Sequence, residues 1–502
     1  MNIVKKITGW TISVLIVFST LIVCSLPIEV AAWDGETGNC TWCLDDETKV
    51  LTISGKGAMK NYENTWDMPW CGSNIEKIVV EEGVTSIGDN CFSQDSFVES
   101  DRKIKNVVLP STLKRIGKAA FSYCVKLKNI SIPESVTEIG EGAFCNSGIT
   151  SVTLPQNIKT ISSEMLCNTN ITSIKIPTKV SKIGWRAFCG TKIKSVIIPS
   201  NVKTISGCAF ENCNNLKTVK LSNGIQKIAD SAFLGSYKIS KINLPASAKI
   251  TKDLKWAFFD TNAKITVSSK NKYYSAKGGV LFNKKKTILY QYPTWKKTKK
   301  YTIPKTVKEI YGDAFKGITK LTKVTMGNNV SKIGTYAFAQ CSKLKTIKLS
   351  KNISKLGSGV FQNCKSLTSI TLPMKITKLP NDTFNGCSKL KNVNFSKESK
   401  LRSIDGGAFA DCKSIVGVLG IPDSVTSIGE WAFYGCKKMQ GVVVSANVKK
   451  IGEQSLGFYN SIGTANSNGH VIKKIKNFAI YGKNGSAVQK YANKNGIKFI
   501  AE

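Results

Sequence analysis

A phrase of 22 or 23 residues recurs along most of the chain. Residues 330–350 read VSKIGTYAFAQCSKLKTIKLS, and residues 353–373 read ISKLGSGVFQNCKSLTSITLP. A unit this short cannot bury its own hydrophobic face, so successive copies must stack and share a core. The repeat therefore predicts a solenoid in place of several independent globular domains.

The copies align on one aromatic position, which Leu occupies twice. Its members are Phe92, Phe121, Phe144, Leu166, Phe188, Phe210, Phe233, Phe258, Phe315, Phe338, Phe361, Phe384, Phe409, Phe433 and Leu456. Downstream comes L-x-x-I-x-L, whose final alternation and β-branched residues predict a short strand. Ala337, Phe338 and Cys341 would share one face of a single helical or 3₁₀ turn. The predicted fold class is α/β: a solenoid whose coils of about 23 residues each add one short strand to a parallel β-sheet and one such turn.

The first residues predict export. Lys5 and Lys6 precede an apolar run at 12–26, and small residues at 30–32 offer a cleavage site. We expect residues 1–32 to be a signal peptide that is cleaved after Ala32, and the mature chain to be secreted or held at the cell surface. The alternative is that the apolar run is retained as a membrane anchor. No transmembrane segment is expected in the mature chain, because no other apolar stretch is long enough.

The repeat phrase resembles the BspA-type, or Treponema pallidum-type, leucine-rich repeat. The segment 39–62, followed by Pro69 and Trp70, is similar to the cap that precedes such repeats, and 480–500 resembles their closing segment. The resemblance implies a leucine-rich repeat solenoid outside the cell or on its surface. It implies attachment to host matrix or surface proteins or to other cells, and no reaction.

The chain is thereby divided into six segments. They are a signal peptide at 1–32, an N-terminal cap at 33–74, leucine-rich repeats at 75–263, a β-hairpin-type insert at 264–304, leucine-rich repeats at 305–459 and a C-terminal cap at 460–502. In the last segment, Ser486 and Gln489 form a capping-box pattern and Gly496 follows an apolar stripe, which predicts a short helix. In the insert, apolar residues at 280–282 and 288–290 flank a Lys-rich turn and predict a hairpin.

Aromatic residues of the insert allow two interpretations. Tyr292, Trp295 and Tyr301 lie among lysines and could form an exposed basic-aromatic patch. They could instead cover the small core of the hairpin. The second interpretation is favoured, because an isolated hairpin needs packing to be stable.

The chain contains 16 cysteines. Most follow the repeat aromatic by one or three residues, where stacked side chains are too far apart for a disulfide, so a role as small buried side chains is favoured. Cys40, Cys43 and Cys71 lie in the N-terminal cap, and we expect at least one disulfide among them. Their spacing fits neither a redox centre nor a zinc site, so no metal site is expected.

Outward-facing strand positions are the candidates for a binding surface. In each strand, the residue between the two inward apolar residues and the residue before the first of them point away from the core. On the predicted concave face these positions are Asn106, Ser131, Ser151, Thr153, Ser173, Lys175, Ser195, Lys220, Asn243, Thr325, Lys348, Thr371 and Asn394. A flat array of this kind fits an extended partner better than a small molecule, and a solvated face without a partner is the alternative.

The charge balance predicts a second kind of partner. With 72 Lys and Arg against 33 Asp and Glu, the formal net charge is +39, and a field of this size attracts polyanions. Outside a cell these are anionic wall polymers or glycans, and no nucleic-acid partner is expected for an exported chain. The C-terminal residues carry no sorting motif, so noncovalent retention is expected.

No catalytic constellation is visible. The chain has a single His, His470, and no Ser or Asp stands in a pattern with a base, so no catalytic residue and no cofactor are expected. The predicted function is an extracellular or cell-surface binding or adhesion protein that presents a repeat surface to a protein or glycan. The alternative is a cell-wall-associated structural protein held by its basic charge.

Overall fold

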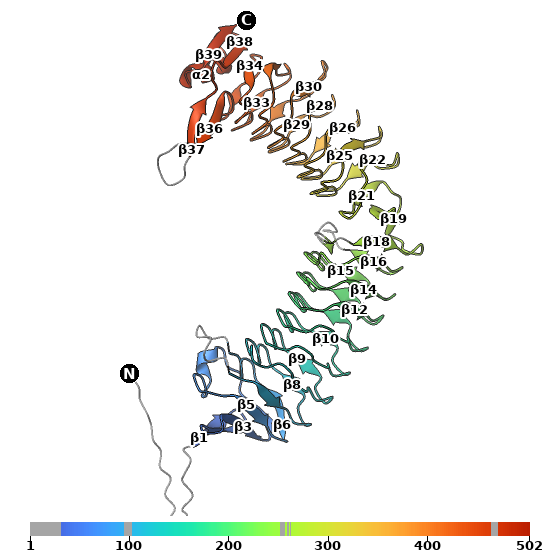
Figure 1. Cartoon of the computed structure of the whole chain (residues 1–502), viewed down its shortest axis with the longest axis vertical. Helices are drawn as coiled ribbons and strands as arrows, with labels where there is room; N and C mark the ends of the chain where they lie inside the picture. The colour runs from blue at the N-terminus through green and yellow to red at the C-terminus, as the bar shows by residue number, and fades with distance from the viewer. Residues whose placement is uncertain (1–31, 95–102, 251–256, 259–260, 262, 463–469) are drawn as a thin grey trace, which may run out of the picture.

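Each coil of the solenoid has three sides, and the coils stack into an open arch with a cap at either end (Figure 1). The computed structural model describes residues 32–94, 103–250, 257–258, 261, 263–462 and 470–502. The predicted solenoid of short parallel strands is confirmed. Most of the predicted signal peptide, residues 1–31, lies outside the described residues.

The first side of the coils, here called the long ladder, carries strands of three to five residues that pair in parallel with those of neighbouring coils. Its strands are β5 (Lys77–Val80), β7 (Asn106–Val108), β12 (Ser195–Ile198), β14 (Thr218–Leu221), β16 (Lys241–Leu244), β18 (Lys264–Val267), β22 (Lys300–Thr302), β24 (Lys323–Thr325), β26 (Thr346–Lys348), β28 (Ser369–Thr371), β30 (Asn392–Asn394), β32 (Gly417–Gly420), β34 (Met439–Val443), β38 (Ala479–Gly482) and β39 (Lys498–Ala501). The pleat alternates their side chains. In β26, Ile347 is buried and its neighbours Thr346 and Lys348 are exposed.

The second side, here called the short ladder, carries strands that are mostly two residues long. They are β4 (Gly57–Ala58), β6 (Val84–Ile87), β8 (Arg115–Ile116), β9 (Glu138–Ile139), β10 (Thr160–Ile161), β11 (Lys182–Ile183), β13 (Thr204–Ile205), β15 (Lys227–Ile228), β17 (Lys249–Ile250), β23 (Glu309–Ile310), β25 (Lys332–Ile333), β27 (Lys355–Leu356), β29 (Lys378–Leu379), β31 (Ser403–Ile404), β33 (Ser427–Ile428) and β35 (Lys450–Ile451). Glycine often follows the strand because the coils approach closely there. A Cβ on Gly357 would lie 2.2 Å from the backbone nitrogen of Thr335 in the preceding coil.

The third side, here called the turn side, carries the repeat Phe and faces the interior of the arch (Figure 1). The single helical or 3₁₀ turn predicted here is wrong. The residues two before and two after the Phe have positive φ, as at Tyr336 (54°) and Gln340 (60°) around Phe338, and such residues cannot continue a right-handed turn.

Alternate N–H groups of the turn side bind the next coil instead. Tyr336 donates to the carbonyl of Ser358 at 2.9 Å and Phe338 to that of Val360 at 2.9 Å. The residues between them close short turns within the coil, as when Ala339 donates to the carbonyl of Tyr336 at 3.0 Å. The turn side is therefore a third ladder between coils, and the sequence reasoning missed it.

The repeat Phe side chains form a continuous stack within each half of the arch, broken in the N-terminal half at Leu166. The ring centroids of Phe315 and Phe338 are 4.7 Å apart and those of Phe338 and Phe361 are 5.6 Å apart, with interplanar angles of 14° and 17°. These spacings match the distance between paired strands, so the backbone ladders set the stacking distance. Every described member of the Phe series is buried.

The repeat cysteines that follow the aromatic by three residues are buried as predicted, and they also hydrogen-bond, whereas Cys145, which follows by one residue, is only partly buried. The thiol of Cys364 donates to the carbonyl of Phe338 in the preceding coil at 3.1 Å, and Cys341 donates to Phe315 at 3.0 Å. Where Ser236 takes the same position, its hydroxyl donates to the carbonyl of Phe210 at 2.7 Å. Many coils therefore place a small side chain with a donor at this position, which is more than the hydrophobic role that the sequence indicated, although Ile318 occupies it in the coil of Phe315.

The N-terminal cap is an antiparallel meander of β1 (Ala32–Thr37), β2 (Cys40–Asp45) and β3 (Val50–Gly55), with a 3₁₀ turn, η1 (Thr65–Asp67). Strand β3 pairs in parallel with β5 and so begins the long ladder. Trp70 stacks on Phe92 with ring centroids 5.9 Å apart, and it closes the end of the Phe stack.

The disulfide predicted in this cap is not formed. Cys40 and Cys43 are both free thiols, and every pairing among the three predicted cysteines needs one of them. Cys40 is buried and Cys43 is exposed, because residues three apart on a strand point to opposite faces. Cys71 is exposed.

The insert is a three-stranded antiparallel meander of β19 (Tyr274–Lys277), β20 (Val280–Asn283) and β21 (Ile288–Gln291), which confirms the predicted hairpin. It is shorter than the predicted range 264–304, since β18 and β22 still belong to the long ladder. Strand β21 joins the short ladder through β23. Tyr292 is buried and stacks on Phe315 at 5.0 Å, so it supports the core interpretation and begins the second Phe stack.

The meander divides the hydrophobic core in two, whereas the sequence predicted one continuous core. Leu281 belongs to the core of the N-terminal half, while Val280 and Phe282 belong to that of the C-terminal half. Strand β20 can serve both cores because its alternating side chains point to opposite faces.

The C-terminal cap contains the predicted helix, α2 (Ala487–Lys494), with Ser486 as its N-cap and Gly496 at a φ of 57° after its end. A hairpin of β36 (Phe458–Ile462) and β37 (His470–Lys474), which the sequence did not indicate, precedes it. Figure 1 shows this hairpin projecting to the inner side of the arch.

Phe338→Ala should lower the free energy of unfolding by about 3–5 kcal/mol, because it opens a cavity between two stacked rings. Denaturant unfolding of the purified mature chain measures this. Thr346→Ala, an exposed change in the next strand, is the control and should stay within about 0.5 kcal/mol of the parent. Equal effects of the two changes would contradict the stacked core.

The repeat thiols should resist alkylation in the folded protein. Burial raises the pKa of the Cys341 thiol to about 12, so almost no thiolate forms at pH 8. Peptide mass spectrometry after brief iodoacetamide treatment should find Cys43 modified and Cys341 intact, and both modified in denaturant. Modification of Cys341 at the rate of Cys43 in the native chain would contradict its placement.

Candidate functional site

The thirteen predicted binding residues lie along the outer surface of the long ladder and its irregular continuation, here called the strand stripe. All are exposed except Thr325, which is partly buried. Consecutive coils hold them in register, since Thr325 pairs with Lys348 and Thr371 with Asn394. Side chains also bond along the stripe, where the hydroxyl of Ser151 donates to Asn129 at 2.9 Å.

Five of the predicted residues come together in one open groove. Ser131, Ser151, Thr153, Ser173 and Lys175 line it, and it has a volume of about 640 Å³. The long ladder is irregular there, because a single bridge between Asn129 and Ser151 replaces regular strands. The small side chains at these positions leave the groove open.

A second groove, of about 550 Å³, lies in the C-terminal half of the stripe. Lys348 and Thr371 line it, together with Met374. The other predicted residues stand singly on the stripe. The structure therefore gathers seven of the thirteen candidates into two grooves.

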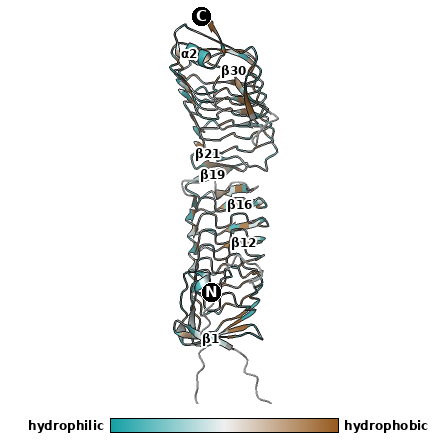
Figure 2. Cartoon of the chain, turned by 90° about the vertical axis from the view of Figure 1, so that its left-hand side faces the viewer, coloured by the Kyte–Doolittle hydropathy of each residue, from teal (hydrophilic) through white to brown (hydrophobic). Residues whose placement is uncertain are grey.

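The prediction placed the strand stripe on the concave face, and the stripe does not lie there. Figure 2 looks onto the inner side of the arch, and β12, β16 and β30 lie along one edge of that view. The turn side occupies the inner face because the arch bends toward it (Figure 1). The stripe is therefore a flank of the arch.

A row of lysines follows the short ladder, and we call it the lysine row. It consists of Lys182, Lys227, Lys249, Lys332, Lys355, Lys378 and Lys450, all exposed. Lys227 pairs with Lys249 and Lys332 with Lys355 in adjacent coils. The register brings like charges together along the row, so a polyanion laid along it would offset their repulsion.

Acidic partners offset the row at only a few described positions. Lys332 lies 2.7 Å from Glu309, and Lys378 lies 2.7 Å from Asp405. At the N-terminal end of the stripe, Lys105 donates to Glu76 at 2.8 Å and lowers the pKa of that carboxyl group. Exposed pairs of this kind leave the overall field strongly positive.

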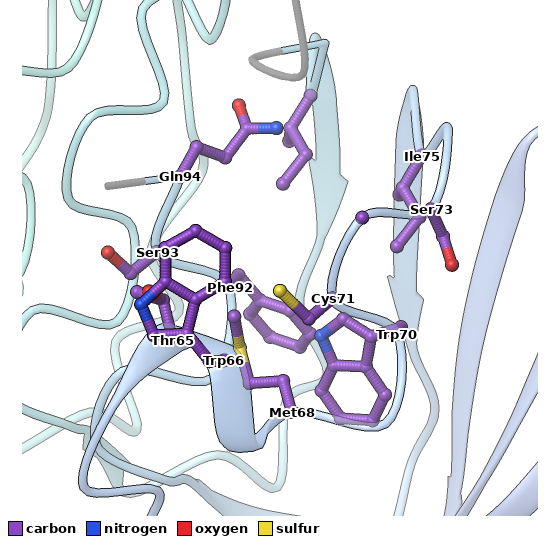
Figure 3. Close-up of a pocket in the computed structure, with 12 residues that line it drawn as sticks. Thr65, Trp66, Met68, Trp70, Cys71, Ser73, Ile75, Phe92, Ser93 and Gln94 are labelled. Carbon is purple, nitrogen blue, oxygen red and sulfur yellow. The ribbon is translucent and has the colours of Figure 1, made fainter. Parts of the chain in front are cut away.

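A small cavity lies where the N-terminal cap meets the first coil. Figure 3 shows Trp66, Met68, Trp70 and Phe92 gathered on one side of it. Its volume is about 80 Å³, well below the roughly 300 Å³ of typical ligand sites. The cavity is a packing seam of the cap.

Neither a metal centre nor a membrane span is found in the part of the chain that the structure describes. Within it, no group of three or more His, Cys, Asp or Glu side chains could hold a metal ion. No helix in these residues has the length and apolar character needed to cross a membrane.

Comparison with known proteins agrees with this architecture. The model of the BspA type leucine rich repeat region matches residues 67–191, 94–216, 183–290, 286–416 and 396–498. A leucine rich cell surface protein from Faecalibacterium prausnitzii is 24% identical, with a TM-score of 0.52 over 79% of this chain and 94% of that one. No protein with a curated description matches the chain.

Two further solved structures are similar over most of their length. A leucine-rich repeat protein from Eubacterium ventriosum is 25% identical over 88% of this chain and all of that one, with a TM-score of 0.39. One from Bacteroides ovatus is 20% identical over 92% of this chain and 98% of that one, with a TM-score of 0.47.

Proposed function

The chain belongs to the BspA-type leucine-rich repeat family, and from that premise we propose that it is an extracellular or cell-surface binding protein without a catalytic role. Its strand stripe binds an extended protein or glycan partner. The partner belongs to the host matrix, a host surface or another cell. The similar F. prausnitzii chain is described as a cell surface protein, which agrees with the export signal predicted at residues 1–32.

The observation that supports this proposal most is the register of the strand stripe. Small polar side chains repeat at the strand spacing, and adjacent ones face the same way, as Ser369 and Asn392 do. These side chains are not needed for the core, which the inward residues fill. An ordered, open and polar surface of this kind suits a partner that runs across several coils.

A matched pair of variants tests the stripe. Thr153→Arg places a bulky cation in the 640 Å³ groove, whereas Thr160→Arg makes the same change on the short ladder of the same coil. Binding of the immobilised mature chain to a panel of matrix proteins and intact cells should fall roughly tenfold in the first variant only. Equal binding of both variants would contradict the stripe as the interface.

The lysine row favours a second candidate function, a wall-associated structural role. Its exposed lysines stand in register and most lack a carboxylate partner within the described salt bridges. A polyanionic wall polymer could run along the row and contact one lysine per coil. Each contact contributes at most about 1 kcal/mol, so retention depends on many together.

Protein held in this way should leave intact cells in 1 M NaCl, where the screening length falls to about 3 Å. Blots of the wash and of the cells measure it. In assays of binding to isolated walls, the double variant Lys227→Gln and Lys355→Gln should bind more weakly than the double variant Lys343→Gln and Lys389→Gln. The second variant removes the same charge at positions outside the lysine row. Protein that resists salt but leaves on wall digestion or with detergent would contradict the charge model.

A further inference from the structure

A hollow of about 790 Å³ is lined by residues of neighbouring coils and of the hairpin β36–β37, beside the C-terminal cap. It lies on the turn side, away from both the strand stripe and the lysine row. Its floor is made by Gly406, Gly407 and Ala410, from the coil of Phe409. Because this coil carries no large side chains there, a trough one coil wide remains between its neighbours.

The two walls of the trough differ in chemistry. The preceding coil supplies Asn381, Asp382 and Asn385, and the amide of Asn385 donates to Asp382 at 2.7 Å. The following coil supplies Trp431 and Tyr434. One wall is therefore polar and the other aromatic.

The hairpin β36–β37 forms the rim of the hollow. Asn460 and Ile472 from the two strands line it. The hydroxyl of Tyr434 donates to the side-chain oxygen of Asn460, which ties the aromatic wall to the hairpin. The cap thereby turns an open turn side into a hollow.

Trp431 has a backbone conformation that is unfavourable for a large side chain. It has a φ of 56°, a conformation that favours Gly, Asn or Asp. The same position holds Gly142, Asp313 and Gly407 in some coils and Ala119, Arg186 and Tyr336 in others. Its side chain is 50% exposed, so the ring adds little to the core. The indole nitrogen donates to Gln454 at 3.2 Å, which holds the ring in place. The core therefore does not require a Trp at this position.

The charge of the hollow is opposite to that of the chain. Of the twelve lining residues, none is Lys or Arg, and Asp382 and Glu430 are acidic. The carboxamides of Asn381, Asn385, Gln454 and Asn460 add both donors and acceptors. A polyanion would be repelled here, and a simple cation would need acceptors only.

We propose that this hollow binds an uncharged oligosaccharide. A sugar ring has an apolar C–H face that can lie against Trp431, and hydroxyl groups around its edge that pair with carboxamides and carboxylates. The volume lies within the range of small-ligand sites and accommodates a few sugar units. The site is independent of the strand stripe, so either can fail without the other.

Calorimetry and saturation-transfer NMR on the mature chain test the site. The probes are β1,4-linked tetramers of glucose and of N-acetylglucosamine and a galactose-containing tetrasaccharide. We expect at least one to bind, with an affinity that does not change between 0.15 and 0.5 M NaCl because the ligand is uncharged. Thr153→Arg on the strand stripe should leave this binding intact.

Trp431→Asn separates binding from folding, since Asn is well suited to positive φ and should keep or raise the unfolding midpoint. It should weaken binding by roughly tenfold or more, and Trp431→Phe should retain most of it. The matched control is Trp185→Asn, which changes another exposed Trp of a turn side that does not line the hollow. The proposal would be overturned if none of the probes binds, or if a tetralysine peptide binds in their place. An equal loss of binding in both Asn variants would also overturn it.

Discussion

The close approach of one coil to the next is the constraint on which the rest of the molecule depends. Three ladders of hydrogen bonds hold neighbouring coils at the spacing of paired strands. At that spacing the Phe rings stack, the repeat thiols reach the carbonyls of the preceding coil, and a Cβ after the short strand has no room. The phrase recurs because each copy meets the same geometric demands from both neighbours.

This arrangement separates the residues that stabilise the fold from those that meet other molecules. The inward residues of each coil satisfy the ladders and the core, while outward positions vary at little cost to stability. The types of residue at these outward positions differ from one side of the coils to another. Small polar residues are frequent on the strand stripe, the lysine row follows the short ladder, and the aromatic residues Trp431 and Tyr434 lie on the turn side.

Much of this could be predicted from the sequence, because the repeat period and the alternation of Ile and Leu are local signals. The helix of the C-terminal cap could also be predicted from a local signal, since Ser486 and Gly496 mark its ends. The turn around Phe338 was misjudged because residues at i, i+1 and i+4 fit a helix as well as a series of turns. Frequent Gly and Asn two residues from the Phe, as at Asn363 and Gly386, were the available signal for positive φ. The hollow could not be predicted, since it needs the hairpin to fold back over coils that precede it.

The division of the core at β20 has a mechanical consequence. Each half of the arch buries its own side chains, and the two cores share one strand whose opposite faces they cover. A pulling force transmitted along the chain would meet this shared strand as a boundary, so one half can open while the other keeps its coils closed. A chain built in this way can yield in two steps under load, because the coils of one half do not depend on the core of the other.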